Sequence, residues 1–444
     1  CKKDGVLVRS TCSSFPVIAS TRSLLHKAIK ILVFLGCMCG FLYQTFEFLE
    51  MYWAYPTILD VRTLKPMEVE SPALSFCNAN RIRRKPFCTD MPDYCTKYAN
   101  KTDLCDTFPI YCNELKTEEE LGLWVPAGSS DNYTREYVQK LGESFNDFLH
   151  ICRVYGDVKS NCRNPVNVSW VNMGYPNNCF TVESLWGLPE AQVQKMPLNG
   201  KIVLKLQPQP EQYFSWSDLI SVHILLHEAH SLENPFTEGL TIETGKDYNV
   251  FINQRITERL PAPYNTNCTD YLKQWKENGG YGPMTGKACT EQCIVENMLE
   301  MNGCVAQTVN SPGNYPICED FGIYPSDDIN KKCSQQCTDA CWEVSYDIIR
   351  YKVQSDPSLG CHEKDLNCKH KSSFFIFLFH HMEVQKTVHR PRYESIELFS
   401  FIGGYIGMWL GISLIALFDF IETLLALVIY MCRNKRRKNA IKFY

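Results

Sequence analysis

Two long apolar segments near the ends of the chain constrain what it can fold into. The first is ILVFLGCMCGFLYQTFEFL, Ile31 to Leu49, and the second runs from about Ile396 to Cys432. Each is long enough for a membrane helix, which needs roughly 20 apolar residues to cross a ~30 Å hydrocarbon core. A cleaved secretory signal is not favoured for the first, because a long polar stretch precedes it and no small-residue cleavage site follows it. We therefore expect two membrane helices.

Basic residues flank both segments on the sides that face the chain ends. Such clusters stay in the cytoplasm, so both termini are expected inside and the charged middle of the chain outside, as in a multi-pass plasma-membrane protein. The clusters are Lys2, Lys3, Arg9, Arg22, Lys27 and Lys30, then Arg433, Lys435, Arg436, Arg437 and Lys438. The expected divisions are a cytoplasmic segment 1–26, helix 27–52, extracellular domain 53–394, pore helix 395–432 and cytoplasmic tail 433–444.

The cysteines support this topology independently. Of 23 cysteines, 18 lie in the middle segment, and an even number in an oxidising compartment allows up to nine disulfides of open connectivity. Disulfide candidates include Cys77, Cys179, Cys268, Cys289, Cys293, Cys304, Cys318, Cys333, Cys337, Cys341, Cys361 and Cys368. N-glycosylation sequons occur in the same segment, at Asn100, Asn132, Asn167 and Asn267. The middle segment is therefore predicted to be a disulfide-rich extracellular domain.

Hydrophobic periodicity in this domain predicts a mixed α+β fold. Three segments have the alternation or apolar content of strands: Lys201–Gln207, Leu219–Glu228 and Tyr248–Arg259. Cys289–Cys304 is predicted to be a helix, and Ser373–Val388 an extended segment that leads into the second membrane helix. The predicted fold class is an α+β membrane protein with two transmembrane helices and a large disulfide-rich ectodomain.

Sequence patterns that suggest an enzyme are weak. His223, His227, Glu228 and His230 in HILLHEAH resemble a metal site, but the His-Glu-x-x-His spacing of zinc proteases is absent. Strand alternation places His223 and His227 on one face and His230 on the other, so ordinary strand residues near a surface are favoured. No phosphate-binding glycine loop or nucleophile elbow occurs. We expect no enzyme, no metal site and no cofactor.

Partners are constrained less directly. Cys333, Cys337 and Cys341 could ligate a metal as thiolates, but an extracellular location favours disulfides. The net charge of −4 points to no particular partner, and no nucleic-acid ligand is expected.

The second apolar segment carries features that a simple membrane anchor does not need. Its 37 residues would extend about 55 Å as a straight helix, so it must tilt, protrude or break. Gly403, Gly407 and Gly411 recur every four residues, which also suits simple helix packing. A carboxylate at membrane depth, such as Asp419 or Glu422, usually faces water or a partner. Several subunits that each supply one such helix would form an acidic ring, which attracts cations.

These motifs resemble the degenerin, epithelial sodium channel and acid-sensing channel superfamily over nearly the whole chain. The resemblance assigns Gly411, Ile412 and Ser413 to a Gly-x-Ser selectivity filter and Asp419 and Glu422 to its acidic pair. Further matches are Tyr55-Pro56, NCFT (Asn178–Thr181), LPAPY (Leu260–Tyr264) and the cysteine spacings Cys289-x3-Cys293 and Cys333-x3-Cys337-x3-Cys341.

The resemblance implies a homo- or heterotrimer of related subunits in a lipid bilayer. Each subunit would carry a hand-like ectodomain with a β-sheet palm and a helical thumb and finger. The implied activity is a sodium-selective, amiloride-sensitive pore, with permeant Na⁺ and no other cofactor. By the same resemblance, Gly403, Gly404 and Gly407 line the pore and the amiloride site, and Tyr55 and Tyr264 pair to couple the ectodomain to the gate.

Three features depart from the family pattern. The family's Cys-Gly-Cys is Asn302-Gly303-Cys304 here, which removes one usual disulfide partner. Ser13 and Ser14 occupy the place of the N-terminal His-Gly pair, so gating and selectivity are expected to differ from the family norm. The chain also begins with Cys1 and not methionine, and residues are expected to be missing before it.

The gating stimulus is left open by the sequence. The stretch Trp53–Asp60 contains no histidine, which disfavours proton gating. Gating by an extracellular peptide, as in the FMRFamide-gated branch, is the leading hypothesis, while mechanical, proton, chemical and constitutive gating remain alternatives. A protein of another class, a non-conducting receptor or adhesion ectodomain with two anchors, is disfavoured because an anchor needs neither the intramembrane acids nor Gly-Ile-Ser.

Overall fold

The chain divides into two compact units in a computed structural model, and each unit is described by itself. The first unit comprises Cys1–Ile58, Pro263–Asn265 and Arg390–Tyr444, and the second Leu59–Ala262 and Thr266–His389. The structure describes residues 24–97, 122–124, 134–156, 159–172, 174–197, 199–213, 220–310, 312–313, 315–320, 322–354 and 372–411.

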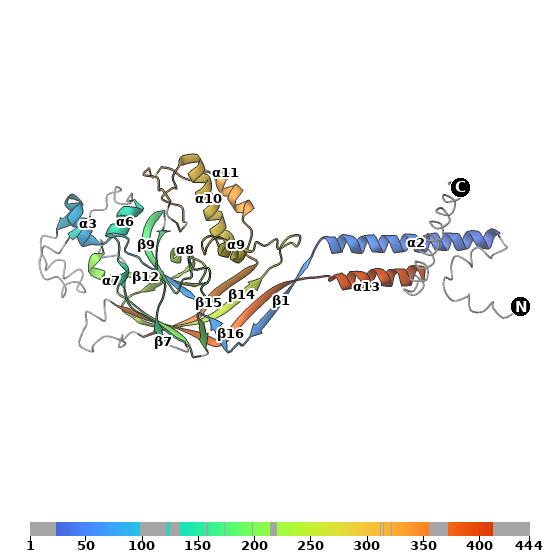
Figure 1. Ribbon diagram of the computed structural model, residues 1–444, viewed down its shortest axis with the longest axis horizontal. Helices are drawn as coiled ribbons and strands as arrows, with labels where there is room; N and C mark the ends of the chain where they lie inside the picture. Colours follow the sequence, from blue (N-terminus) through green and yellow to red (C-terminus); the bar gives the residue numbers. More distant parts are fainter. Residues whose placement is uncertain are drawn as a thin grey trace, which may run out of the picture. The chain divides into compact units, whose positions relative to one another are not determined.

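Two apolar helices dominate the first unit (Figure 1). Helix α2 (Leu24–Trp53) contains Ile31–Trp53, which within the described ranges is the one helix long and apolar enough to cross a membrane. Helix α13 (Ser395–Tyr405) continues as a π-helix, η5 (Ile406–Leu410), and both are apolar. The backbone N–H of Glu394 donates to the Glu397 carboxylate at 3.1 Å, so the helix start is capped. The predicted first helix, 27–52, corresponds to α2, and the predicted second helix begins where α13 does.

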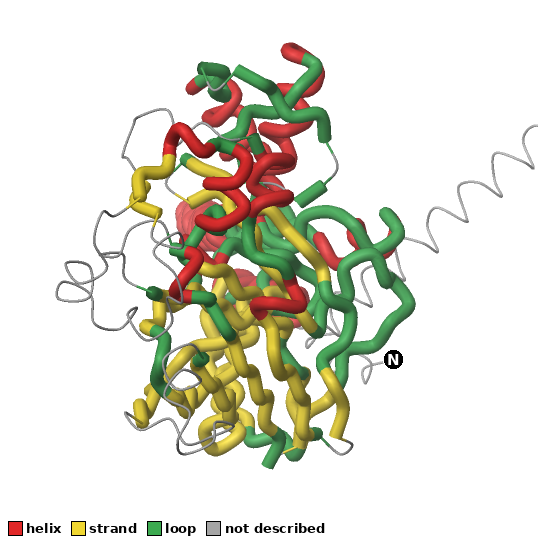
Figure 2. The backbone as a smooth tube through the Cα atoms, turned by 90° about the vertical axis from the view of Figure 1, so that its left-hand side faces the viewer, coloured by secondary structure: helices red, strands yellow, loops and turns green. Residues whose placement is uncertain are grey.

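A large sheet forms the framework of the second unit (Figure 2). Among the described residues it contains twelve strands, all paired antiparallel on the main path except β14 with β16. In spatial order the path is β7 (Lys159–Asn161), β6 (Leu149–Tyr155), β11 (Lys201–Leu206), β16 (Ser373–Pro391), β14 (Asp247–Glu258), β15 (Trp342–Gln354), β12 (Ser221–His227), β3 (Ala73–Asn78), β9 (Tyr175–Val182) and β8 (Val166–Asn172). Strand β1 (Thr57–Leu64) pairs with β16, and β13 (Leu240–Glu243) with β12.

Alternating apolar side chains of these strands form the main core. Phe76 of β3, Phe180 of β9 and Phe375 of β16 are almost completely buried, and Tyr248 of β14 stacks on Phe375 with ring centroids 5.3 Å apart. The period-two pattern explains why β11, β12, β14 and β16 lie within one or two residues of the predicted strands, apart from β16 extending to Pro391. Two small sheets pair β10 (Lys195–Pro197) with β2 (Glu68–Glu70) and β4 (Cys95–Lys97) with β5 (Gly122–Trp124).

Helices α10 (Gly286–Asn302) and α11 (Asp327–Gln336) pack on each other to one side of the strands (Figure 1). The Thr285 hydroxyl accepts the N–H of Ala288 at the start of α10, and Gly303 at φ +72° ends it, in a backbone conformation that glycine adopts readily. The predicted helix Cys289–Cys304 is therefore confirmed with shifted ends. The remaining helices are α3 (Arg84–Asp90), η2 (Pro92–Tyr94), α6 (Arg135–Leu141), α7 (Phe145–Phe148), η4 (Pro210–Gln212), α8 (Pro235–Glu238) and α9 (Tyr271–Glu277).

Disulfide bonds cross-link the second unit. Cys333, Cys337 and Cys341 pair with three different cysteines, which confirms disulfides over thiolate ligands. Cys304 pairs with Cys318, so it has a partner although Asn302 replaces the family cysteine. Cys361 and Cys368 lie outside the described residues. The described pairs are Cys77–Cys179, Cys88–Cys95, Cys152–Cys162, Cys268–Cys341, Cys289–Cys337, Cys293–Cys333 and Cys304–Cys318.

The disulfide between α10 and α11 should contribute more stability than a local one. Cys293–Cys333 closes 40 residues and Cys88–Cys95 closes 7, so by loop-closure entropy the former should stabilise by about 1.5 kcal/mol more. We expect Cys293→Ala/Cys333→Ala to lower the thermal midpoint of the detergent-solubilised chain more than Cys88→Ala/Cys95→Ala does. Equal shifts in the two double variants would contradict this ranking.

Candidate functional site

The candidate pore segment changes its helical geometry just before the predicted filter. Helix α13 becomes the π-helix η5 at Ile406, and the segment reaches Gly411 at φ +64°. The N–H of Gly411 donates to the carbonyl of Gly407 at 3.1 Å, closing the last turn. A left-handed residue at a helix end is a common helix stop, and glycine adopts it without steric cost. Gly411 is the first predicted filter residue; Ile412, Ser413, Asp419 and Glu422 lie outside the described residues.

The glycines above the filter leave an open surface on the described part of the chain. A Cβ atom added at Gly403, Gly404 or Gly407 would meet no atom within 4 Å. These positions therefore have room for a ligand or for other helices. Their assignment to the pore and to an amiloride site stays a prediction, as does the assignment of Ser13 and Ser14, which are not described.

Tyr55 and Tyr264 lie in contact within the first unit. Their ring centroids are 5.5 Å apart with planes at 80°, the edge-to-face arrangement that aromatic pairs favour. Tyr55 has φ +47°, an uncommon conformation for a non-glycine residue, which turns the chain between α2 and β1. Tyr264 belongs to a loop between β14 and α9. The predicted partners are thus brought together, whereas their role in gating is not established by this contact.

Two predicted glycosylation sites can be placed. Asn167 in β8 and Asn267 before α9 are both exposed, so a glycan could be attached at either. In the second sequon the middle residue, Cys268, is disulfide-bonded to Cys341. Asn100 and Asn132 lie outside the described residues.

The histidines of HILLHEAH are arranged differently from the prediction. Strand β12 ends at His227, so His230 lies in the following turn and not on the opposite strand face. His227 is buried and not near the surface: its Nε2 lies 2.7 Å from the Ser75 hydroxyl and its Nδ1 2.9 Å from the Glu228 carbonyl. Burial lowers the pKa of His227 to about 4. No metal-binding cluster of three or more His, Cys, Asp or Glu occurs among the residues described.

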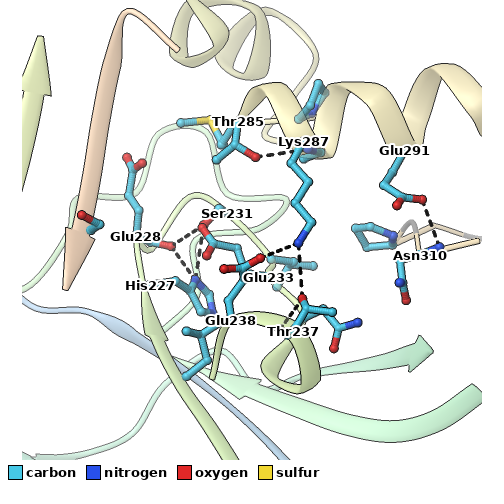
Figure 3. Close-up of a pocket in the computed structure, with 18 of the residues that line it drawn as sticks. His227, Glu228, Ser231, Glu233, Thr237, Glu238, Thr285, Lys287, Glu291 and Asn310 are labelled. Carbon is cyan, nitrogen blue, oxygen red and sulfur yellow. Dashed lines mark hydrogen bonds and ion pairs between the residues drawn. The ribbon is translucent and has the colours of Figure 1, made fainter. Parts of the chain in front are cut away.

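A cavity of about 390 Å³ lies where the end of β12, the loop after it and the start of α10 meet (Figure 3). Its wall is partly apolar, with Trp170, Trp186 and Met284, and partly acidic. The carboxylates come from Glu228, Glu233, Glu238, Glu291 and Glu343. Among the described lining residues, Lys287 is the only lysine or arginine.

Ion pairs and hydrogen bonds hold parts of this cavity wall. Lys287 of α10 is 2.5 Å from the Glu238 carboxylate and 3.3 Å from the Thr237 hydroxyl (Figure 3). Glu233 accepts a hydrogen bond from the Ser231 hydroxyl at 2.9 Å, and burial raises the pKa of Glu233 to about 7. The cavity therefore offers negative charge beside apolar surface, a combination suited to an organic cation. Sequence reasoning missed it because its wall comes from distant segments, although the acid-rich stretch HEAHSLENPFTE was a signal.

A second buried carboxyl, that of Glu143, lies in the same unit between α6 and α7. Glu143 is 3% exposed; one of its oxygens accepts from the Asn78 amide at 3.2 Å, and the other has no partner within the described residues. Burial raises the pKa of Glu143 to about 7, opposed by Arg83 and the Asn78 hydrogen bond and reinforced by Asp147 and Glu211. Near neutral pH this group changes its protonation state.

Comparison with known proteins places the chain in a family. The profile "Amiloride-sensitive sodium channel" matches residues 7–423. Acid-sensing ion channel 1A of Danio rerio is 22% identical over 456 residues, covering 91% of this chain and 84% of that protein. Degenerin mec-10 of Caenorhabditis briggsae is 22% identical over 291 residues, 59% of this chain, and the match spans 40% of that protein. A cryo-EM structure of a proton-activated chloride channel aligns at 7% identity over 90% of this chain and 97% of that chain, with a TM-score of 0.31.

A disulfide-linked α+β unit joined to apolar helices, with these relatives, defines the class of degenerins and acid-sensing channels. The chain belongs to the amiloride-sensitive sodium channel family. Members of this family are membrane-embedded ion channels and not enzymes, and they assemble as oligomers of related subunits.

The tyrosine contact gives the first prediction on function. Tyr55→Ala and Tyr264→Ala should each shift channel activation, because an edge-to-face pair is worth about 0.5–1.5 kcal/mol and ~1.4 kcal/mol changes an open-to-closed ratio tenfold. The double variant should be no more impaired than the stronger single one. Tyr→Phe at each position keeps the ring and serves as the control. Activation is measured from currents. If the shifts of the two single variants add up in the double variant, the contact has no role in gating.

Glu143 gives a prediction on stability against pH. Its folded pKa of about 7 exceeds its ordinary value of 4.5, so between these values the folded chain binds more protons than the unfolded chain. Lowering the pH from about 7 to about 4.5 should therefore add stability, about 3 kcal/mol for this group alone.

Comparison with Glu143→Gln isolates this contribution. His227 acts in the opposite sense over about pH 6.5 to 4, because its folded pKa is lowered, but it is present in both chains. Denaturant unfolding across this pH range should show a smaller gain for Glu143→Gln than for the unmodified chain. Parallel stability profiles would show that Glu143 does not titrate as stated.

Proposed function

We propose that the chain is one subunit of a trimeric, sodium-selective, amiloride-sensitive cation channel of the plasma membrane. Helix α2 and the segment 395–432 cross the membrane, and both termini are cytoplasmic. The extracellular domain is hand-like: the large sheet is the palm, and α10 with α11 is the thumb. The trimer contains identical or related subunits, and each contributes one pore helix.

The end of the described pore segment is the observation that carries this proposal. Gly411 leaves the helical conformation at φ +64°, at the first residue of Gly-Ile-Ser. Carbonyl groups beyond a helix end are free of intrahelical hydrogen bonds, and rings of such carbonyls can replace the water around a permeant ion. The chain thus stops its helix where a filter of backbone oxygens is needed. A helix that served only as an anchor would gain nothing from this change.

The acids beyond the filter fit the same role. Asp419 and Glu422 would be costly in lipid, whereas in a hydrated path they would attract Na⁺ and repel anions. A membrane-anchored receptor or adhesion protein, the alternative from another class, has no need for them.

Gating by an extracellular ligand, a peptide, is the proposed mode. The acid-lined cavity beside α10 supports it, because Glu228 and Glu233 could hold a basic group while Trp170 and Trp186 contact apolar side chains. Mechanical and constitutive gating of the same channel are alternatives. Proton gating is favoured by one observation, the buried carboxyl of Glu143 with its pKa of about 7.

The pore assignment is tested by voltage-clamp recording in oocytes with a panel of pH values and neuropeptides, with and without amiloride. Asp419→Asn should lower conductance or divalent block, because each subunit loses one charge; about 1 kcal/mol at close range corresponds to an about fivefold change in cation occupancy. Gly407→Leu should weaken amiloride block about tenfold or more, equivalent to ~1.4 kcal/mol. Ser413→Cys should alter the preference for sodium over potassium.

Surface labelling provides the control, since all three variants should reach the plasma membrane in the amount of the unmodified chain. Gly36→Leu is a matched substitution outside the pore segment, and a Cβ there meets no atom within 4 Å in the part of the chain that the structure describes. Amiloride sensitivity that survives Gly407→Leu would place the blocker elsewhere. Unchanged currents in Asp419→Asn would remove that residue from the pore.

A further inference from the structure

Two stripes of side chains join the two apolar helices of the first unit. Gly40, Gln44 and Phe48 recur every four residues on α2, and Phe401, Tyr405 and Trp409 recur every four residues on the second segment. Phe48, 3% exposed, packs against Phe401 at 4.6 Å and Tyr405 at 6.4 Å between centroids. Trp409 reaches the other two members of the first stripe. The stripes therefore run antiparallel and in register.

Gly40 makes the hole that the Trp409 indole fills. A Cβ atom added at Gly40 would lie 2.8 Å from both Cη2 and Cζ3 of that ring, closer than real side-chain contacts allow. One turn earlier on the same helix, a Cβ at Gly36 would meet no atom of the described residues within 4 Å. Space for the indole therefore depends on glycine at position 40 and not on glycines in this helix generally.

Gln44 supplies the polar part of the same contact. The indole N–H of Trp409 donates to the Gln44 side-chain oxygen at 2.8 Å. Both groups lie in apolar segments where water is not available to replace a lost partner, so the bond favours one register of the two helices. A glutamine at this position of α2 is otherwise unfavourable in lipid.

Trp409 lies close in the chain to the predicted filter, so its contact with α2 affects the backbone that leads to the filter. Trp409 lies in η5, two residues before Gly411, where the helix stops. Wider π-helical turns occur often at functional sites, and here the turn carries the aromatic residue that contacts α2. Fixing the indole therefore restrains the backbone that leads directly into Gly411.

We propose that Gly40, Gln44 and Trp409 form a lock through which the first membrane helix positions the filter. Gly40 and Gln44 are positioning residues: they touch no ion, but they set the place of Gly411 through Trp409. The lock thereby makes ion preference depend on α2. This inference rests on the proposed channel function. It adds that two residues of α2, the helix without the filter, influence which ions pass.

The test compares Gly40→Ala with its matched control, Gly36→Ala, by reversal potentials in sodium and potassium and by amiloride block. Gly40→Ala should change the sodium-to-potassium permeability ratio by about twofold to thirtyfold, the range expected for residues that act through others. Gly36→Ala should leave it unchanged. Surface labelling must show equal amounts of both variants at the membrane.

A second substitution separates positioning from general damage to packing. Trp409→Phe removes the outer ring atoms that clash with a Cβ at position 40, so Gly40→Ala/Trp409→Phe should have the ratio of Trp409→Phe alone. Gln44→Leu and Trp409→Phe each break the hydrogen bond, and their double variant should show no further shift. A merely structural role for Gly40 would lower current amplitude without moving the ratio.

The outcomes for the lock and for the channel can be distinguished. An unmodified chain that reaches the surface and carries no current under any stimulus contradicts the proposed function and the positioning role with it. A conducting chain in which Gly40→Ala and Gly36→Ala behave alike, or in which the Gln44 and Trp409 effects add, overturns the lock alone. Thermal unfolding of the detergent-solubilised chain tests the contact without current: Gly40→Ala should lower the midpoint and Trp409→Phe should restore it, and no such rescue would also overturn it.

Discussion

The packing of Phe48 against the second apolar segment is the contact on which the candidate pore depends. Phe48 is the one fully buried apolar side chain of α2 within the described residues, and it is enclosed by Tyr393, Phe401 and Tyr405. In the proposed membrane location, lipid is as apolar as these rings, so the hydrophobic effect alone would not hold the helices together. Shape, ring contacts and the Gln44–Trp409 hydrogen bond must do so, which makes the pairing specific and sensitive to single atoms.

Local periodicity was sufficient to predict much of the fold. Strands such as β11 and β14 and helix α10 depend on patterns that a few consecutive residues carry, and the structure has them close to their expected bounds. Disulfide partners were not predictable, because pairs such as Cys77–Cys179 and Cys289–Cys337 depend on how segments far apart in the sequence fold together. The π-helix was missed for another reason: glycines four residues apart fit an α-helix equally well.

The candidate sites also differ in whether a short sequence motif marks them. Gly411 and the tyrosine pair were found because each belongs to a short motif, and the structure shows a helix stop at one and a ring contact at the other. The cavity beside α10 and the buried carboxyl of Glu143 carry no such motif. Nothing in LGESF indicates that its glutamate is buried, since its burial depends on contacts with Asn78 of β3 and Asn178 of β9.

Protonation changes the stability of the second unit in two opposite directions, and these directions matter for whether protons could open the channel. As the pH falls below about 7, Glu143 and Glu233 lose a charge that burial disfavours, which stabilises the fold. His227, with a pKa of about 4, is forced to stay neutral below its ordinary value of 6.5, which costs stability. The two effects overlap between about pH 6.5 and 4.5, where two carboxyls act against one histidine, and only the histidine acts between about pH 4.5 and 4. Acidification alone would therefore stabilise this unit before destabilising it. Opening on acidification would require an open state in which these carboxyls are more deeply buried than in this conformation. A ligand that binds the acid-lined cavity needs no such condition, because it can stabilise the ionised carboxylates directly.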